Sequence, residues 1–179
     1  QKELLLPERR VVSSSRVQFR SYSGLCRGGK TTAANQRCTM AKEGNLLIVD
    51  DNSSILGALR LLLERHFAKV TTLTSPKLLD TVLRGEAVDA VLLDMNFTAG
   101  VNNGNEGIYW LRRIRDIRPD VKVVLFTAYA DVDLAVRSMR DGAVDFVVKP
   151  WDNERLVASL RNACELARSQ REVKRLREI

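Results

Sequence analysis

Three carboxylates, one hydroxyl and one amine stand at the ends of four apolar runs of the chain. Asp50 and Asp51 close the first run, Asp94 the second, Thr127 the third and Lys149 the fourth. Clustered carboxylates repel one another unless a cation joins them, and a hard divalent ion such as Mg²⁺ prefers oxygen ligands. Phosphoryl transfer needs a nucleophilic carboxylate, a cation that gathers oxygens, and donors for the transferring group. If the four ends meet, the sequence predicts a site for that chemistry.

Each of these residues also has an ordinary structural explanation. Asp50 and Asp51 could cap a following helix, because carboxylates accept hydrogen bonds from the first N–H groups of a helix. Asp94 could be a loop acid, Thr127 a strand-end hydroxyl and Lys149 a solvated amine. The joint pattern favours a shared site, because these five residues all stand at the ends of four different apolar runs, on the predicted ligand edge.

The elements that must position these groups alternate between apolar strands and amphipathic helices. Strands are predicted within residues 46–50, 69–74, 90–94, 122–127 and 143–150, and helices within residues 53–66, 76–83, 106–117, 132–139 and 152–167. Strict alternation of this kind favours an α/β fold with a parallel sheet and helices on both faces. Ligands of such open sheets bind beyond the carboxyl ends of the strands, where the five polar residues stand.

The positive charge of the chain is concentrated at its beginning. The formal net charge is +7, and residues 1–39 hold eight Lys/Arg against two Asp/Glu, while the remaining 140 residues hold 21 against 20. We expect residues 1–43 to form a disordered basic tail, because they lack a persistent apolar period. The tail could be added or upstream sequence before a start at Met40, a targeting peptide, or a nucleic-acid-binding arm. The first is favoured, because Met40 stands just before the first strand.

One segment of the tail matches a nucleotide-binding pattern. Gly24–Thr31 reads GLCRGGKT, which fits the phosphate-loop signature G-x-x-x-x-G-K-[ST]. That loop needs a buried strand before it and a helix after it, and both flanking segments here are polar and broken. We therefore interpret the match as chance.

Other classes of protein are disfavoured by composition. The apolar runs fall far short of the roughly 20 residues that a membrane span requires. Cys26, Cys38 and Cys164 are scattered without metal-ligand spacing, and His66 has no Cys or carboxylate near it at such spacing. We therefore expect a protein of a reducing compartment, the cytoplasm, without a membrane-spanning segment.

Four motifs in order, LLIVDD, AVLLDMN, VVLFTA and GAVDFVVKP, resemble the receiver domain of two-component response regulators over about residues 44–168. The resemblance implies a flavodoxin-like, doubly wound (βα)5 three-layer sandwich with a parallel sheet in the order 2-1-3-4-5. It implies a signalling domain, not a conventional enzyme, that accepts a phosphoryl group from a sensor histidine kinase on Asp94. The segment DFVVKPWDNERL is similar to receivers of the nitrogen-regulation type, which control transcription.

The resemblance also assigns roles around Asp94. Mg²⁺ or Mn²⁺ would be held by three carboxylates and one backbone carbonyl, those of Asp50, Asp51, Asp94 and Met95, and the phosphoryl oxygens would be contacted by Thr127 and Lys149.

Further positions correspond to the moving and rate-setting parts of the family. Phe146 matches an aromatic switch, whose ring turns inward as Thr127 moves toward the phosphate. Asn96 and Tyr129 match positions that tune hydrolysis of the acyl phosphate, and the peptide bond before Pro150 is expected to be cis. From the residues alone, Phe146 is simply a core aromatic.

The segment after Asp94 departs from the family pattern and suggests two rival functions. It reads NFTAGVNNGNEG, which is a few residues longer than usual, with Thr98 where the family has proline. DMNFT nearly fits the D-x-D-x-T signature of haloacid dehalogenase-like phosphohydrolases, but Asn96 replaces the acid that donates a proton. A flavodoxin-like FMN module is also disfavoured, because Asp50 and Asp51 would repel a phosphate.

Two questions concern the output. Leu166, Val173 and Leu176 indicate that residues 169–179 form a helical linker or dimerising coil, or a solvated extension of the last helix. We expect a receiver of a longer transcriptional activator, which would contact DNA only through an output domain outside this chain; the alternative is a stand-alone receiver that signals by protein contact. Phosphorylation is expected to promote a homodimer through residues 131–140 and 152–167.

Overall fold

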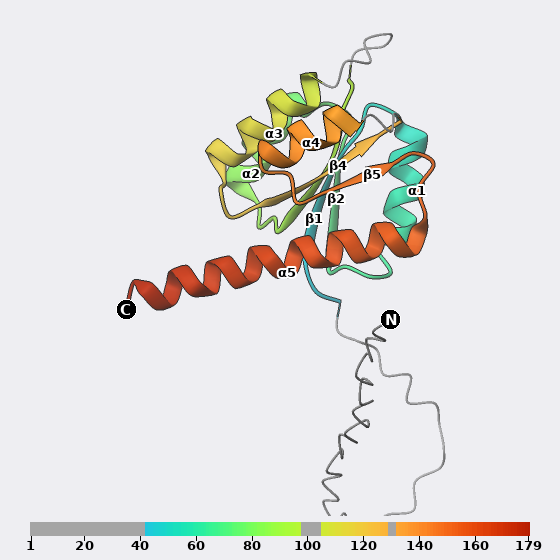
Figure 1. Cartoon of the computed structure of the whole chain (residues 1–179). Coiled ribbons are helices and arrows are strands. Elements are labelled where there is room, and N and C mark those ends of the chain that lie inside the picture. Colours follow the sequence, from blue (N-terminus) through green and yellow to red (C-terminus); the bar gives the residue numbers. More distant parts are fainter. Residues whose placement is uncertain (1–41, 98–104, 129–131) are drawn as a thin grey trace, which may run out of the picture. The chain divides into compact units, whose positions relative to one another are not determined.

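The computed structural model describes residues 42–97, 105–128 and 132–179 (Figure 1). In this part of the chain, parallel strands alternate with α-helices, and a short 3₁₀ helix, η1, precedes the second α-helix. The strands are β1 (Asn45–Val49), β2 (Lys69–Leu73), β3 (Ala90–Asp94), β4 (Lys122–Thr127) and β5 (Asp145–Val148). The helices are α1 (Ser53–Leu63), η1 (Pro76–Leu78), α2 (Leu79–Gly85), α3 (Asn105–Ile117), α4 (Val132–Arg140) and α5 (Asn153–Arg177).

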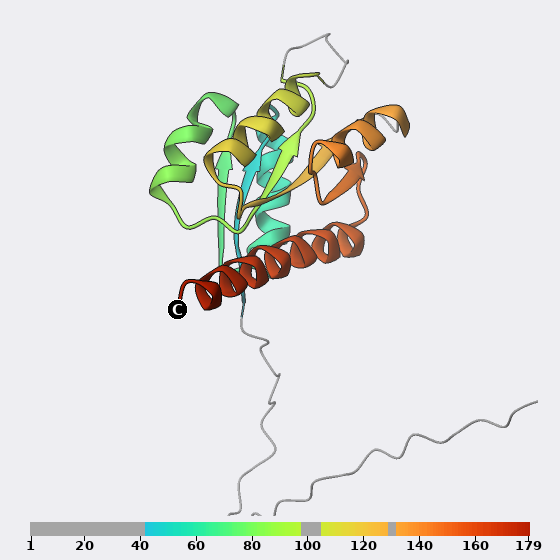
Figure 2. The ribbon, with the colours of Figure 1, turned by 60° about the vertical axis from the view of Figure 1, so that its left-hand side comes forward.

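The sheet has the strand order β2-β1-β3-β4-β5, and all neighbouring strands are parallel. Helices α1 and α5 cover one face, and α2, α3 and α4 cover the other (Figures 1 and 2). This arrangement confirms the predicted doubly wound three-layer fold. The chain order reverses direction at β1 and β3, so the predicted ligand edge lies between and beyond their carboxyl ends.

Two apolar cores explain why the strands lack polar alternation. Leu46 and Ile48 of β1 pack with α1 and α5, while Leu47 and Val49 pack with the helices on the opposite face. Successive side chains of a strand point to opposite faces. The part of a strand that is covered on both faces must therefore be apolar at every position, as β1 is from Leu46 to Val49.

The helix predicted over residues 76–83 is divided into η1 and α2. Ser75 Oγ accepts the N–H of Lys77 at 3.4 Å, and Pro76 stands in the first position. Proline suits this position because the first N–H groups of a helix have no partner within the helix. The tighter first turn therefore reflects local capping.

The last strand begins at Asp145, two residues later than predicted, because the preceding residues terminate α4. The N–H of Ala143 binds the carbonyl of Ser138 at 3.0 Å, and Gly142 has a φ of +96°. A Cβ at Gly142 would lie 2.6 Å from the guanidinium of Arg115. The guanidinium ends a flexible side chain that can shift, so it is the positive φ that favours glycine at this turn.

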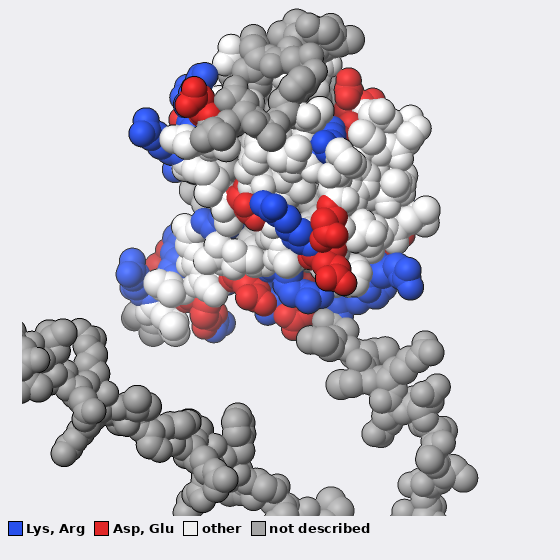
Figure 3. All heavy atoms as spheres, turned by 45° about the vertical axis from the view of Figure 1, so that its right-hand side comes forward, with Lys and Arg blue, Asp and Glu red and all other residues white. Residues whose placement is uncertain are grey.

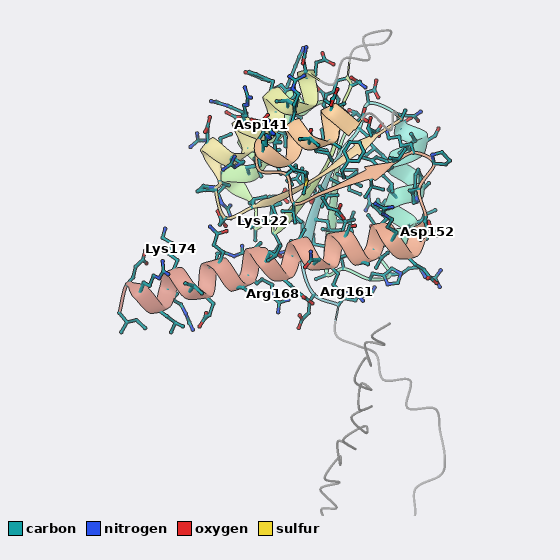
Figure 4. The ribbon with its side chains drawn as sticks, in the orientation of Figure 1. Lys122, Asp141, Asp152, Arg161, Arg168 and Lys174 are labelled. Carbon is teal, nitrogen blue, oxygen red and sulfur yellow. The ribbon has the colours of Figure 1, made fainter. Side chains whose placement is uncertain are left out.

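Helix α5 continues well beyond residue 167 as one unbroken helix. It begins after Asp152, whose side chain caps it by accepting the N–H of Arg155 at 2.8 Å. Its later turns remain tied to the domain, because Arg171 pairs with the buried Asp89 and Gln170 accepts a hydrogen bond from Lys122. Figure 4 shows Lys122 beside the middle of this helix. Residues 169–171 therefore extend the helix along the domain, and residues 172–177, which are exposed, continue it beyond these contacts.

Several sequence-based predictions lie outside the described residues. The tail is described only at its last two residues, and the loop pattern at Gly24–Thr31, the start at Met40, Thr98 and Tyr129 are not described. Within the described part, no helix is both long and apolar enough to span a membrane. Figure 3 shows acidic and basic side chains interspersed on one face of the domain, in keeping with the nearly balanced charge beyond residue 39.

Candidate functional site

The carboxyl ends of β1, β3, β4 and β5 bring the sequence-predicted residues to one edge of the sheet. Asp94 is the last residue of β3 and Thr127 the last of β4, while Asp50 and Lys149 directly follow β1 and β5. Asp50, Asp94 and Thr127 are buried, and Asp51 is exposed. The parallel pairing of the strands accounts for this convergence, since it places all carboxyl ends on the same side.

Lys149 connects two of the carboxylates. Its Nζ donates to Asp50 Oδ2 at 2.6 Å and to Asp94 Oδ1 at 2.9 Å. The side chains of Asp50 and Asp94 are 1% and 8% exposed, and that of Lys149 is 16% exposed. Each carboxylate taken alone would be costly to bury, so the shared ammonium compensates both of them.

The turn after β1 holds Asp50 in place. Its backbone N–H donates to the carbonyl of Leu73 at 3.1 Å, and its Oδ1 accepts the N–H of Asn52 at 2.9 Å. Asn52, not Asp50 or Asp51, caps α1, because its side chain accepts the N–H groups of Ser54 and Ile55. The capping alternative for the two aspartates is therefore wrong.

The electrostatic surroundings oppose ionisation of Asp94 and favour that of Lys149. Burial raises the pKa of Asp94 to about 6; hydrogen bonding and charge attraction from Lys149 lower this pKa, and the negative charge of Asp50 raises it. Burial lowers the pKa of Lys149, but its hydrogen bonds to Asp50 and Asp94 outweigh this effect and leave the pKa raised. The ammonium of Lys149 therefore remains charged at neutral pH. The pKa of the neighbouring Asp94 carboxyl, about 6, lies only a little below neutral pH.

The acidic cluster fits a hard divalent cation. Asp50, Asp51 and Asp94 each offer one oxygen, and these oxygens lie within 4.8 Å of one another. The carbonyl of Met95 accepts the N–H of Gly107 at 3.0 Å and retains a second lone pair. The three carboxylates offer oxygen ligands only, which suit Mg²⁺ or Mn²⁺.

Of the predicted switch and rate-tuning residues, the structure describes Thr127, Phe146 and Asn96. The carbonyl of Thr127 accepts the N–H of Lys149 at 2.6 Å, so these two residues are joined through the backbone. Phe146 is partly buried against the core on the side of α2, α3 and α4. Asn96 is partly buried directly after Met95, and the peptide bond before Pro150 is cis.

Two neighbours of the site were not singled out from sequence. Phe126 lies beneath Lys149, with the ammonium 4.6 Å from its ring centroid; the only signal was an aromatic residue directly before Thr127. Gly107 lies against Met95, where a Cβ would come within 2.7 Å of the Met95 Cα. The helix α3 can approach the β3 end closely because residue 107 has no side chain.

The fold and this edge together define a signalling domain of the receiver class. The carboxyl groups of Asp50 and Asp51 after β1 disfavour the phosphate of a nucleotide or flavin at that position, whereas they suit a metal-assisted phosphoacceptor.

The chain belongs to the response regulator receiver domain family, whose family model matches residues 46–161. It is similar to the C4-dicarboxylate transport transcriptional regulatory protein DctD of Pseudomonas aeruginosa, with 35% identity over 132 residues, 74% of this chain and 28% of the relative. The alginate biosynthesis transcriptional regulatory protein AlgB of the same organism is 36% identical over 118 residues, 66% of this chain and 25% of the relative. The matched region therefore spans only about a quarter of these relatives.

Solved structures agree with this assignment. The N-terminal signal receiver domain of a two-component system response regulator from Bacteroides fragilis is 56% identical, with a TM-score of 0.62 over 69% of this chain and 98% of that one. NtrX from Brucella abortus, in complex with ADP, is 26% identical, with a TM-score of 0.66 over 75% of this chain and 29% of that one. The phosphohydrolase and FMN-module alternatives are therefore wrong.

Proposed function

We propose that this receiver domain accepts a phosphoryl group from the phosphohistidine of a sensor histidine kinase onto Asp94. The observation that supports this most directly is the position of Lys149 Nζ, within 2.9 Å of Asp94 and 2.6 Å of Asp50. An Asp94 oxygen attacks phosphorus, the phosphorus–nitrogen bond of the donor breaks, and the histidine nitrogen leaves with the electron pair. The product is an acyl phosphate on Asp94.

The residues around Asp94 divide the remaining work. A bound Mg²⁺ would neutralise phosphoryl oxygens as charge develops on them, and its ligands would come from Asp50, Asp51, Asp94 and the Met95 carbonyl. Lys149 would shift from the Asp94 carboxylate to a phosphoryl oxygen, with the hydroxyl of Thr127 contacting another. Movement of Thr127 toward the phosphate would let Phe146 turn inward and change the outer surface, and Asn96 and Tyr129 would set the rate of acyl-phosphate hydrolysis.

Incubation with acetyl phosphate and Mg²⁺ tests this proposal, because a small donor bypasses the unidentified kinase. We expect the mass of the protein to increase by that of one phosphoryl group, which intact-mass spectrometry measures. Borohydride trapping followed by peptide mapping should locate this group at Asp94. EDTA should abolish the incorporation, since the acidic cluster then lacks its cation. Trapping at any other residue, or undiminished incorporation in EDTA, would contradict the proposal.

The domain's output is proposed from its relatives. DctD and AlgB are named as transcriptional regulatory proteins, and the matched region covers 28% and 25% of them. We infer that phosphorylation of Asp94 controls transcription through an output domain that contacts DNA and is not included in the described residues. The rival is a receiver that signals by protein contact alone.

Phosphorylation is also proposed to promote a homodimer through α4, β5 and α5. Val136 and Met139 on α4 are 44% and 47% exposed, and Leu166 and Val173 on α5 are 44% and 48% exposed. A groove of about 420 Å³ is lined by Val144, Leu166 and Val173, together with the polar side chains of Lys122, Ser169 and Gln170. Exposed apolar patches of this kind are typical of interaction sites.

Sedimentation with and without beryllofluoride tests the dimer. We expect the mimic to raise the mass of the wild-type protein toward twice the monomer value, and Met139→Glu to prevent the rise by placing a charge in the interface. Leu61→Glu is the matched control, because Leu61 is 73% exposed on α1, away from the proposed interface. An unchanged mass for the wild type, or an equal loss in both variants, would contradict the proposed surface.

A further inference from the structure

The ammonium of Lys149 has a third neighbour besides its two carboxylates. Its Nζ lies 4.6 Å from the centroid of the Phe126 ring, within the distance at which the negative face of an aromatic ring attracts a cation. Asp50 and Asp94 accept hydrogen bonds from the same nitrogen. The ammonium is therefore held between two carboxylates and an aromatic face, in a largely buried position.

The ring of Phe126 is itself firmly placed. Phe126 is 1% exposed and belongs to the core beneath α1 and α5. Its backbone pairs with Asp94 on one side and Val147 on the other, and its carbonyl accepts the N–H of Met95 at 3.0 Å. The ring of Trp151 meets it edge-on, with centroids 5.4 Å apart and an interplanar angle of 61°. The aromatic face is consequently part of the rigid sheet.

We propose that Phe126 is a positioning residue for phosphoryl transfer, whose ring holds the Lys149 ammonium in place through a cation–π interaction. This inference rests on the proposed function of Asp94 and Lys149. During the reaction the ammonium must exchange a carboxylate oxygen of Asp94 for a phosphoryl oxygen. The attraction of the ring face does not depend on which oxygens the ammonium contacts, so Phe126 keeps the ammonium at the site before and after transfer.

The competing explanation is that Phe126 only fills the core. An aromatic ring at this position buries a large apolar surface whether or not a cation lies above it. The two explanations differ in their dependence on the electrons of the ring. Fluorine atoms on the ring withdraw density from its face and weaken cation–π attraction, while they change the size of the side chain little.

A fluorinated series at residue 126 separates the two explanations. We would incorporate 4-fluoro-, 3,5-difluoro- and 3,4,5-trifluorophenylalanine at this position in the full chain. The initial rate of phosphorylation by acetyl phosphate at saturating Mg²⁺ should fall step by step, by about threefold to thirtyfold in total. In the absence of any phosphodonor, ¹⁵N relaxation of the Lys149 ammonium should report increasing motion along the same series. Urea unfolding of each protein would show that the core remains intact.

Phe67 supplies the matched control. It is also 1% exposed and belongs to the same core, but no cation over its ring is recorded among the described residues. The same fluorinated series at Phe67 should leave both readouts unchanged. Phe126→Leu, which removes the ring and leaves a smaller apolar side chain, should slow phosphorylation at least as much as the trifluorinated ring.

The outcomes distinguish this inference from the proposed function. Flat readouts along the Phe126 series, or equal slopes for Phe126 and Phe67, would overturn the positioning role while leaving phosphorylation of Asp94 intact. A wild-type protein that takes up no phosphoryl group would overturn the proposed function instead. In that case the relaxation series would still decide whether the Phe126 ring holds the ammonium.

Discussion

Asp94→Asn is expected to abolish phosphoryl uptake and, at the same time, to stabilise the metal-free protein at neutral pH. Uptake is lost because an amide oxygen is a poor nucleophile compared with a carboxylate. Stability rises because burial opposes the ionised form of Asp94, whose pKa is raised from 3.8 to about 6. Asparagine relieves the carboxylate's conflict with Asp50 and leaves Lys149 paired with Asp50.

The pH dependence of this effect has a defined sign. Below pH 3.8 the Asp94 carboxyl is protonated in both folded and unfolded chains. Between pH 3.8 and about 6 only the folded chain keeps the proton, so stability falls as the pH rises. Above that range the loss is complete and amounts to about 3 kcal/mol. Urea unfolding in EDTA should therefore show the advantage of Asp94→Asn growing from pH 4 to pH 6 and then remaining constant.

Asp120→Asn is the matched control, because the same substitution should have the opposite effect there. The hydrogen bond from Arg118 keeps the pKa of Asp120 below its ordinary value, so the ionised form stabilises the fold. Asp120→Asn should destabilise the protein above pH 4 and leave phosphoryl uptake unchanged. A lower stability of Asp94→Asn at pH 7 would show that the ionised Asp94 carboxylate does not destabilise the folded protein.

Lys149→Met is expected to lower both the stability of the protein and the rate of phosphorylation. Methionine cannot compensate the carboxylates of Asp50 and Asp94, which are 1% and 8% exposed. Removing one partner of a buried ion pair costs about 3–5 kcal/mol. Loss of a positioned donor to the transferring group should also slow phosphorylation by about 100-fold or more. Urea unfolding at pH 8 in EDTA and the acetyl phosphate assay measure the two effects.

Two further variants isolate the cause of this loss. Lys149→Met combined with Asp50→Asn should regain part of the stability, because one uncompensated charge is removed, but it should not regain the phosphorylation rate. Lys69→Met, which removes a largely exposed lysine paired with Glu86 at 2.7 Å, should change neither quantity appreciably. Unfolding of Lys149→Met at the same urea concentration as the wild type would show that the ammonium does not balance the carboxylates.

The fold could be predicted from sequence because its signals are local. The runs LLIV, AVLL and KVVLF are apolar at nearly every position, which requires burial on both faces and so a parallel sheet between helices. Gly142 marked the turn that follows α4, and Pro76 marked the beginning of the helix after β2. The errors were at boundaries, where side-chain caps decide the outcome. Ser75 and Pro76 tighten the first turn before α2, and the Ala143–Ser138 hydrogen bond delays β5.

The extension of α5 shows where local signals are insufficient. Residues 169–179 contain few apolar side chains, so the sequence left open a coil, a linker or a solvated extension. In the structure, Arg171 pairs with Asp89, which is 82 residues away along the chain. Asp89 also accepts the N–H of Asn45 at 2.7 Å. An ion pair between such distant residues depends on how the helix lies across the sheet, which no periodicity in the segment reveals.

The sequence by itself determined which residues could take part in chemistry, since Asp50, Asp94, Thr127 and Lys149 stand at strand ends and parallel strands end on one edge. Only the tertiary structure decided how these residues meet. Lys149 lies 99 residues from Asp50 and 55 from Asp94, and the strand order brings the three side chains together. The ring of Phe126 beneath the ammonium follows from the pairing of β4 between β3 and β5. Strand ends are local properties of a chain, whereas contacts between them depend on the packing of the whole sheet.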